Sequence, residues 1–478
     1  MTTSPLTSKI ILLAAGDAAA GLAALAIALL IRYGGLPDPS LLRLWTFAAP
    51  FLIPLWIIGF VIFGLYDLRA TKNEPRFFEK LAKALAFNFA VSALLFYLIP
   101  GFGIRPLATL FLIFLILSVL VFAWRNAWNA LAARLSKERV LFLGLNEEVI
   151  ELAGFLAENP QLGFVPAGAM PLGNDSDAIG LSASGGMEVI APGQNLDTVV
   201  RERAIGLVVA IHGSNRTKAL ARSLFSIVPL GVVITDFPHF YESVRGRIPV
   251  SLLNEAWFIE NLAGAKRPKY EFGKHILDLA LAVVFGMATL MLLPPIALAI
   301  AASTNSALLG YRRRRARPGD GIVFFRQERV GKNGRRFNFL KFRSQVLGAE
   351  RMSGEKGENG GPDPRAYPLG TFLRKTYLDE LPQIWNVIRG EMSFVGPRPE
   401  RPEFAAELER EIPFYRMREL VLPGITGWAQ INMENDASVS DAPIKLQYDL
   451  YYIKNRSLAL DLTILLKTAL KLLQRSGR

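Results

Sequence analysis

Long apolar stretches separated by short polar ones fill the first quarter of the chain. About 20 apolar residues are enough for a helix to cross the hydrocarbon core of a bilayer. Four stretches with at most one charge reach that length, at residues 10–31, 44–66, 84–104 and 106–124. The first is too long for the apolar part of a cleaved signal peptide, and further spans follow it. The pattern predicts a four-helix transmembrane unit over residues 1–135.

Asp17 is the one charge within these four stretches. Acidic residues inside a membrane are energetically costly, and they often have a function. We favour a role for Asp17 in helix packing or at the lipid interface, with a functional role as the alternative.

Basic residues in the connections predict how this unit is oriented. One side is rich in them, with Arg69, Lys72, Arg76, Lys80, Lys83, Arg125, Arg134, Lys137 and Arg139. The other side has only Arg32, Arg43 and Arg105. Because basic residues concentrate on the cytoplasmic side of a membrane, both ends of the unit are expected to face the cytoplasm.

A fifth apolar run, residues 279–302, is also long enough to span. If it did, the basic stretch 312–317 would lie just beyond its outer end, against the cytoplasmic preference of basic residues. The run contains Pro294 and Pro295, which remove two backbone donors and predict a break in the helix. We predict a re-entrant membrane helix near 276–302 that breaks at these prolines and returns to the cytoplasmic face. A fifth span kinked at proline is the alternative.

Residues 136–262 change to short β-rich runs that alternate with amphipathic helical stretches. Three runs predict parallel strands of a Rossmann-like α/β domain, at 139–145, 206–211 and 231–237. A dinucleotide fingerprint needs Gly-x-Gly-x-x-Gly after the first strand. Only Gly144 is present, and Glu147 and Glu148 stand where a phosphate would lie. The domain is expected to be non-catalytic, with a scaffolding, oligomerisation or regulatory role.

Composition supports the membrane assignment and narrows the chemistry. Hydrophobic residues make up 51% of the chain and the mean hydropathy is +0.29, values that favour a membrane protein. The chain has no cysteine, which excludes disulfides and thiolate chemistry. Residues 310–345 hold twelve Lys or Arg against two acids, out of a net charge of +13. Next to a membrane segment, such a run indicates anionic lipid headgroups rather than nucleic acid.

The residues with the clearest chemistry lie in the last part of the chain, residues 263–478. Asp379 and Glu380 are adjacent, and two like charges in contact resist ionising together unless cations compensate them. An acidic helix start is the alternative explanation. Upstream, two strands around a Gly-Lys-Asn-Gly turn are predicted to project basic residues, namely Arg326, Arg329, Lys341 and Arg343.

Several motifs in this region resemble a known family when taken in order. They are FFRQERVGKNG, KFRS, LDELPQIWNVIRGEMSFVGPRPE, PGITGWAQIN and KLQYDLYYIKNRSL. From about Lys274 onward the chain resembles the bacterial sugar transferases, the monotopic polyprenol-phosphate phosphoglycosyltransferases. The four-span unit and the α/β domain are similar in architecture to the large members that initiate exopolysaccharide, capsule or O-antigen assembly. The chain departs from the family pattern at Leu293, Gln345 and Tyr377.

The resemblance implies a role for each matching residue. Asp379 would be the nucleophile and Glu380 would help bind a divalent metal, Mg²⁺. Arg398, between two prolines, would contact substrate phosphate as a bidentate donor. Lys341, Arg343 and Arg326 are weaker candidates for substrate binding, because a solvated strand face explains them as well. Pro382 suits the first turn of a helix capped near Asp379, a position that would lower the pKa of the nucleophile.

The resemblance also implies an activity and its partners. The chain would transfer a sugar-1-phosphate from a UDP-sugar to polyprenyl (undecaprenyl) phosphate, releasing UMP through a covalent aspartyl intermediate. Its catalytic domain, α+β with the re-entrant helix, would lie on the cytoplasmic face of the bacterial inner membrane. Expected partners are inner-membrane lipids and downstream polysaccharide glycosyltransferases, with a homodimer as an option and no nucleic acid.

Two other functions compete with this one. A membrane-bound nucleotide-sugar dehydratase or epimerase would need a complete glycine fingerprint and a Tyr-x-x-x-Lys pair, a spacing that Tyr270 and Lys274 do have. A non-enzymatic scaffold for polysaccharide assembly would turn over neither a UDP-sugar nor polyprenyl phosphate. Release of UMP from a UDP-sugar in the presence of polyprenyl phosphate distinguishes the transferase from both.

Overall fold

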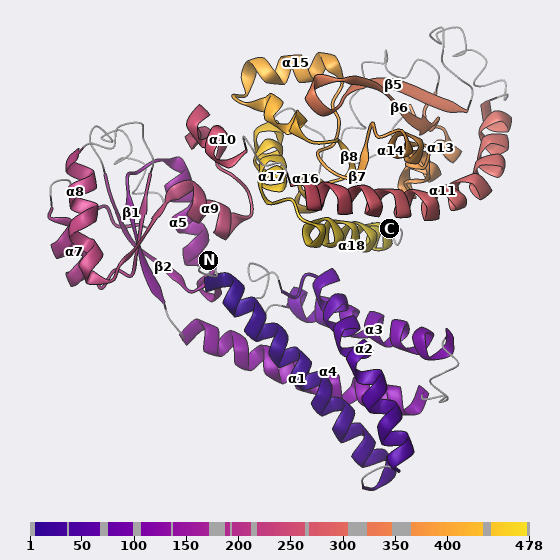
Figure 1. Cartoon of the computed structure of the whole chain (residues 1–478), viewed down its shortest axis with the longest axis horizontal. Coiled ribbons are helices and arrows are strands. Elements are labelled where there is room, and N and C mark those ends of the chain that lie inside the picture. The colour runs from indigo at the N-terminus through magenta and orange to yellow at the C-terminus, as the bar shows by residue number, and fades with distance from the viewer. Residues whose placement is uncertain are drawn as a thin grey trace. The chain divides into compact units, whose positions relative to one another are not determined.

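The chain divides into two compact units, Met1–Val244 and Arg245–Arg478 (Figure 1). The structure, a computed structural model, describes residues 5–35, 38–66, 75–98, 107–134, 137–171, 187–191, 194–211, 218–262, 267–304, 323–346, 365–433 and 441–475. The basic stretch 312–317 lies outside these residues.

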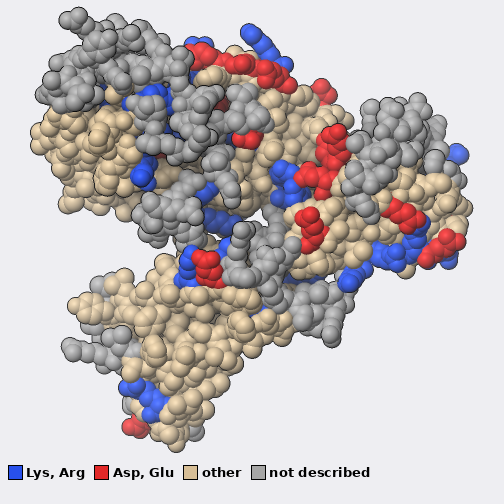
Figure 2. All heavy atoms as spheres, turned by 180° about the vertical axis from the view of Figure 1, so that it is seen from behind, with Lys and Arg blue, Asp and Glu red and all other residues tan. Residues whose placement is uncertain are grey.

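Four long apolar helices begin the first unit. They are α1 (Pro5–Tyr33), α2 (Pro39–Ile62), α3 (Pro75–Leu98) and α4 (Leu107–Arg134). Each contains a segment long and apolar enough to cross a membrane. In Figure 2 the surface of this part is almost free of Lys, Arg, Asp and Glu except at its ends. The chain is a membrane protein, as the apolar pattern predicted.

The third apolar helix differs from its predicted limits. It was expected over 84–104 but begins at Pro75 and ends at Leu98, so the basic residues at 76, 80 and 83 belong to the helix. Its polar first turns are stabilised by an ion pair between Lys83 and Glu79, whose Nζ and Oε1 lie 2.6 Å apart. Phe77, in the first turn of the helix, is 2% exposed, so this turn is packed within the unit. The start of the uncharged stretch, residue 84, is therefore not the start of the helix, which lies earlier in the chain.

Asp17 takes part in a buried ion pair that joins α1 to α4. Arg125 donates from Nε to Asp17 Oδ1 at 3.2 Å and from Nη2 to Oδ2, and its Nη1 donates to the carbonyl of Leu65. The Tyr66 hydroxyl donates to Asp17 Oδ2 at 2.7 Å. A buried charge is tolerated when it is paired and hydrogen-bonded. These contacts confirm the helix-packing role predicted for Asp17.

The remainder of the first unit is the mixed α/β region. Its strands are β1 (Glu138–Leu143), β2 (Phe164–Met170), β3 (Leu207–Ala210) and β4 (Val233–Asp236). They form a parallel sheet in the order β2-β1-β3-β4. Its helices are α5 (Glu147–Glu158), α7 (Leu196–Glu202), α8 (Lys218–Ile227) and α9 (Phe237–Arg245), with short 3-10 turns at Pro160–Leu162 and Val228–Leu230.

Three of these strands were predicted, but β2 was not. Its sequence carries Pro166 and Gly168, residues that are poor strand formers. At the edge of the sheet a proline costs little stability, and the pairing register shifts between Val140 and Leu141, opposite this segment.

After the end of β1, the Asn146 side chain caps α5 by accepting from the amide of Val149 at 2.9 Å. The acidic first turn of α5 disfavours phosphate there.

The second unit is built around one long helix and two small sheets. Helix α11 (Pro268–Thr304) is preceded by a 3-10 turn (Val250–Leu252) and α10 (Glu255–Asn261). Strands β5 (Phe324–Val330) and β6 (Arg336–Phe342) form the predicted antiparallel hairpin. Strands β7 (Ser393–Val395) and β8 (Gly424–Thr426) pair in parallel. The remaining helices are α13 (Pro368–Lys375), α14 (Gln383–Ile388), α15 (Pro402–Glu411), α16 (Trp428–Asn432), α17 (Ala442–Asn455) and α18 (Leu458–Arg475).

Helix α11 continues through Pro294 and Pro295 as 37 helical residues, where the sequence predicted an interruption. Figure 1 shows the helix bending toward its C-terminal end. A proline removes one backbone hydrogen bond and crowds the preceding turn, and a bend relieves both effects without ending the helix. Most apolar side chains of this helix are exposed, including Phe272, Leu290 and Met291.

The first turns of α11 are fastened to the rest of the unit by a buried cluster of charges. Lys274 Nζ lies 3.5 Å from Asp278 Oδ1 and 3.3 Å from Asp461 Oδ2 of α18. The Tyr270 hydroxyl donates to Asp461 Oδ2 at 2.9 Å. The Tyr-x-x-x-Lys pair that suggested a dehydratase therefore makes internal contacts. The Asp278 carboxylate also accepts from the amide of Phe394, which connects α11 to β7.

Candidate active site

The two adjacent carboxylates lie in a single 3-10 turn, Leu378–Glu380, between α13 and α14. Tyr377 directly before it has a φ of 57°, in the left-handed region that a bulky side chain rarely adopts. Such strained backbone is concentrated at functional sites. The predicted helix cap near Asp379 is wrong, because α14 begins only at Gln383 with Pro382 immediately before it.

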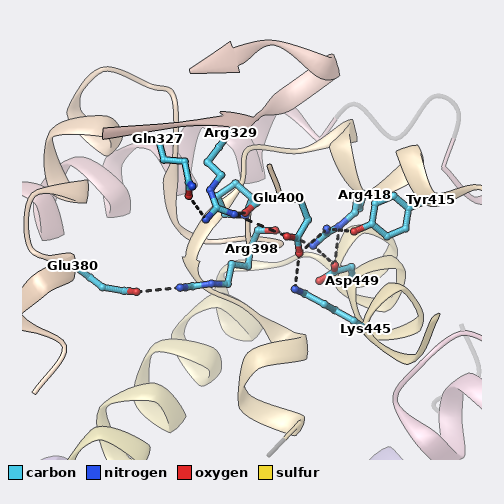
Figure 3. Close-up of polar contacts among 10 residues, drawn as sticks. Gln327, Arg329, Glu380, Arg398, Glu400, Tyr415, Arg418, Lys445 and Asp449 are labelled. Carbon is cyan, nitrogen blue, oxygen red and sulfur yellow. Dashed lines mark hydrogen bonds and ion pairs between the residues drawn. The ribbon is translucent and has the colours of Figure 1, made fainter. Parts of the chain in front are cut away.

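Two cations from distant parts of the sequence meet this carboxylate pair. Lys341 Nζ lies 2.6 Å from Glu380 Oε1 and 3.9 Å from Asp379 Oδ2. Arg398 Nη2 lies 3.1 Å from the same Glu380 oxygen, as Figure 3 shows. The Asp379 residue is 5% exposed. The compensating charge that two adjacent acids require is therefore supplied by Lys341 and Arg398.

The two carboxylates have opposite pKa shifts. Burial raises the pKa of Glu380, but Arg398 and Lys341 outweigh it and lower the pKa to about 2. Burial raises the pKa of Asp379 to about 6, with Lys341 opposing and Glu380 adding to the shift. The sequence-based expectation that helix position lowers the pKa of Asp379 is overturned. Glu380 stays ionised at any ordinary pH, whereas Asp379 ionises only above about pH 6.

Lys341→Met should shift the acidic limb of the pH–activity profile to higher pH. The charge of Lys341 lowers the pKa of Asp379, so its removal raises that pKa further above about 6. If ionised Asp379 is the active form, the rate at each acidic pH then falls. The profile of kcat/KM measured from acid to neutral pH tests this. Arg336→Met is the matched control, because Arg336 lies on the same strand and pairs with exposed Glu328. An unmoved limb in Lys341→Met would contradict the assigned contact.

Lys341 is held in position by a residue that the sequence did not identify. Asn386 of α14 is fully buried, and its Oδ1 accepts from the amide of Leu340 at 3.2 Å. Its Nδ2 donates to the carbonyl of Asn338 at 2.8 Å and to Glu391 at 2.6 Å. Asn386 therefore joins β6 to the helix that follows the carboxylate pair. Asn386 lies seven residues after Asp379 in the same sequence motif, but the sequence gave no sign of its partners.

The remaining predicted site residues lie apart from the carboxylates. Arg326 is exposed and pairs with Leu340 across the hairpin, whereas Lys341 pairs with Phe325, so the two basic side chains project from opposite faces. Arg343 is buried beside Tyr367, whose hydroxyl donates to the Arg343 carbonyl. The cations that act on Asp379 are Lys341, Arg374 and Arg398.

Arg398 belongs to a segment held through its carbonyl groups. The carbonyl of Pro397 accepts from Gly424 N at 2.8 Å, and that of Arg398 accepts from Arg418 Nη2 at 2.9 Å. The carbonyl of Pro399 accepts from Arg329 Nη1 at 3.0 Å, and that of Glu400 accepts from Val330 N at 2.9 Å. Proline has no amide hydrogen to donate. Carbonyl acceptors therefore supply much of the backbone anchoring of this segment, and Figure 3 shows Arg398 extending from it toward Glu380.

The carboxylate pair fits a magnesium site. Mg²⁺ commonly takes one or two protein carboxylates together with substrate phosphates and water. Among the residues that the structure describes, both cations that contact Glu380 do so at Oε1, which leaves Oε2 for a metal. Asp379 and Glu380 would hold such an ion. When bound, it would supply positive charge to neutralise phosphate oxygens.

Comparison with known proteins places these residues in a family. A sequence profile of the bacterial sugar transferases matches residues 269–475. A 260-residue alignment is 36% identical to the UDP-N-acetylgalactosamine-undecaprenyl-phosphate N-acetylgalactosaminephosphotransferase of Aeromonas hydrophila, covering 54% of this chain and 55% of the relative. An exopolysaccharide production protein of Sinorhizobium fredii is 32% identical over 226 residues, 45% of this chain and 91% of the relative. The chain belongs to the bacterial sugar transferase family.

A longer alignment reaches into the first unit. The UDP-glucose:undecaprenyl-phosphate glucose-1-phosphate transferase of Xanthomonas campestris pv. campestris is 31% identical over 348 residues, 70% of this chain and 66% of the relative. The chain thus spans 55% of the length of the Aeromonas relative and 66% of the length of the Xanthomonas relative. The sugar transferase match contains the carboxylate pair and both cations. It begins inside α11, although Val250, Trp257 and Phe258, which precede it, are part of the same hydrophobic core.

Proposed function

We propose that this chain transfers a sugar-1-phosphate from a UDP-sugar to undecaprenyl phosphate and releases UMP. The observation that carries the proposal is the Asp379–Glu380 pair, with Lys341 in contact with both carboxylates and Arg398 in contact with Glu380, in a unit that carries a long exposed apolar helix. The names of the Aeromonas and Xanthomonas relatives, both undecaprenyl-phosphate sugar phosphotransferases, support the same reaction class. The reaction would be the first membrane step of polysaccharide assembly.

Asp379 acts as the nucleophile in this proposal. A carboxylate oxygen attacks the β-phosphorus of the UDP-sugar, and the bond from that phosphorus to the bridging oxygen breaks as UMP leaves. An oxygen of undecaprenyl phosphate then attacks the same phosphorus and frees the carboxylate. Arg398 neutralises charge on the transferred phosphoryl oxygens, and Lys341 favours the ionised form of Asp379. A phosphate acceptor is already ionised near neutral pH and needs no general base.

The direct test is UMP release from a panel of UDP-sugars by the full-length protein in detergent or lipid discs. We expect one UDP-sugar to yield UMP and an undecaprenyl diphosphate sugar when undecaprenyl phosphate is present. Absence of UMP with every donor would favour a non-enzymatic scaffold. An NAD-dependent change of the sugar without UMP would favour a dehydratase or epimerase.

We further propose a layout of three domains. A four-span domain (1–135) and a Rossmann-like domain (136–244) precede a catalytic phosphoglycosyltransferase domain (245–478) on the cytoplasmic face of the bacterial inner membrane. The boundary falls before the predicted residue 262, because Val250, Trp257 and Phe258 pack in the core of the second unit. The bend in α11 would let this helix enter the bilayer and return, with Pro294 and Pro295 at the turning point. Downstream glycosyltransferases and a second copy of the chain are the proposed protein partners.

Cysteine labelling tests the re-entrant arrangement without background, because the chain has no cysteine of its own. Lys269→Cys and Arg326→Cys place single thiols before and after the apolar run. In right-side-out and inverted membrane vesicles, both should react with an impermeant maleimide only from the cytoplasmic side. Reaction from opposite sides would show that α11 spans the membrane. Arg43→Cys, near the start of α2 on the side predicted to face outward, serves as the control of opposite accessibility.

A further inference from the structure

Arg418 lies at the centre of a buried polar network beside Arg398. It sits in a 3-10 helix, Tyr415–Leu420, and its side chain is 5% exposed. Nε donates to Asp449 Oδ2 at 3.1 Å, and Nη2 lies 2.8 Å from the same oxygen in an ion pair. Nη1 donates to the Tyr415 hydroxyl at 2.6 Å and to Glu400 Oε1 at 3.5 Å. Nη2 also donates to the Arg398 carbonyl at 2.9 Å. Figure 3 shows these groups beside Arg398, on the side away from Glu380.

These contacts direct the guanidinium group of Arg418 toward protein partners. All three of its nitrogens take part, through four hydrogen bonds and the ion pair with Asp449. An effect of Arg418 on catalysis would therefore pass through the groups that it holds.

The Arg398 carbonyl is the group among them that leads to the reaction centre. It belongs to the same residue whose guanidinium contacts Glu380. The flanking prolines fix the backbone angle φ at positions 397 and 399, but they do not fix the direction of the Arg398 carbonyl. Arg418 sets that direction from one side by a charge-assisted hydrogen bond, the stronger class of such bonds. Glu400, two residues on, is held by Lys445 Nζ at 2.8 Å as well as by Arg418.

We propose that Arg418 is a positioning residue for Arg398, and so for the contact of Arg398 with Glu380 and with the phosphate being transferred. The inference deepens the proposed function and rests on it for its kinetic consequence. A lysine at this position keeps the positive charge opposite Asp449, but it cannot reproduce the planar fork that reaches Asp449, Tyr415 and the Arg398 carbonyl together.

The test is a double-mutant cycle in the full-length protein. Arg418→Lys should lower kcat/KM for the UDP-sugar by about 10-fold to 100-fold, the usual effect of misplacing a catalytic group by about 1 Å. In an Arg398→Gln background the same substitution should change kcat/KM by less than about twofold, because residues that act through one group are not additive. An equal loss in both backgrounds, or no loss in the wild type, would overturn the proposal. Wild-type protein without UMP release would instead refute the proposed function.

Hydrogen–deuterium exchange tests the positioning itself, whatever the activity. Arg418→Lys should raise amide exchange in a peptide covering 393–401 relative to wild type. Tyr415→Phe is the matched control, because it removes one acceptor of Arg418 Nη1 but leaves the Arg398 carbonyl bonded. Its exchange in 393–401 should equal that of wild type. Unchanged exchange in Arg418→Lys, or an equal rise in Tyr415→Phe, would show that Arg418 only stabilises the fold.

Discussion

Asp379→Asn should abolish transfer of sugar phosphate, with a loss of about 10⁴-fold or more, as expected when a nucleophile is removed. Asparagine has nearly the same size and shape but no carboxylate to attack phosphorus. Wild-type protein incubated with UDP-sugar labelled in the sugar, without undecaprenyl phosphate, should release about one UMP per active site and retain the label. Asp379→Asn should do neither.

The stability of the same variant provides the control for misfolding. Asp379 has a pKa of about 6 in the folded chain, above the usual value of an aspartate, so its ionisation costs stability as the pH rises through about 6. The Asp379→Asn protein should therefore unfold at the same temperature as wild type, or a higher one, near neutral pH. A folded variant that still carried label, or wild-type protein that released UMP only after lipid was added, would rule out the covalent intermediate and leave the transferase assignment intact.

Removal of Mg²⁺ should stop the reaction, and Glu380→Gln should lower the rate by about 100-fold or more. A catalytic metal supplies several kcal/mol of charge stabilisation, which corresponds to at least that factor in rate. Glu380 is ionised at all ordinary pH values because Arg398 and Lys341 overcome its burial. Glutamine keeps the shape but removes the charge that a divalent ion requires. UMP release is measured against MgCl₂ concentration for both proteins after treatment with EDTA.

A shift of the magnesium requirement distinguishes a metal ligand from a residue that only supports the fold. Glu380→Gln should need a higher MgCl₂ concentration for half-maximal rate than wild type does. Glu409→Gln is the control, because Glu409 forms an exposed surface pair with Arg416. Full activity of the EDTA-treated wild type would refute the metal requirement. An unchanged half-maximal concentration in Glu380→Gln would refute the role of Glu380 in binding the ion.

Local patterns predicted those parts of the site that depend on neighbours in sequence. The adjacency of Asp379 and Glu380 predicted a compensating cation nearby. Because side chains of a strand point alternately to the two faces of the β5–β6 hairpin, Lys341 could be that cation. The same alternation separates Arg326 from Lys341, which a list of basic residues does not reveal. The 3-10 turn at the carboxylates was missed because Pro382 can begin a helix as well as precede one.

The supporting residues could not be predicted because their partners are far away in the chain. Asn386 contacts the backbone of a strand that lies 46 and 48 residues earlier. Arg418 contacts Asp449, 31 residues later, and the carbonyl of Arg398, 20 residues earlier. Asparagine and arginine occur on many surfaces, so residue type alone does not mark them. Only the packing of the second unit gives them a single set of partners.

The ion pair between Asp17 and Arg125 has a consequence for biogenesis. The two residues are 108 positions apart, so Asp17 leaves the ribosome long before its counter-ion has been synthesised. An acidic side chain in the middle of a helix disfavours insertion by about 2.5–3.5 kcal/mol. The first helix must therefore rely on its leucines and alanines, or remain near the translocon, until the fourth arrives. A chain whose synthesis stopped between the two helices would keep an unpaired carboxylate within its first membrane helix.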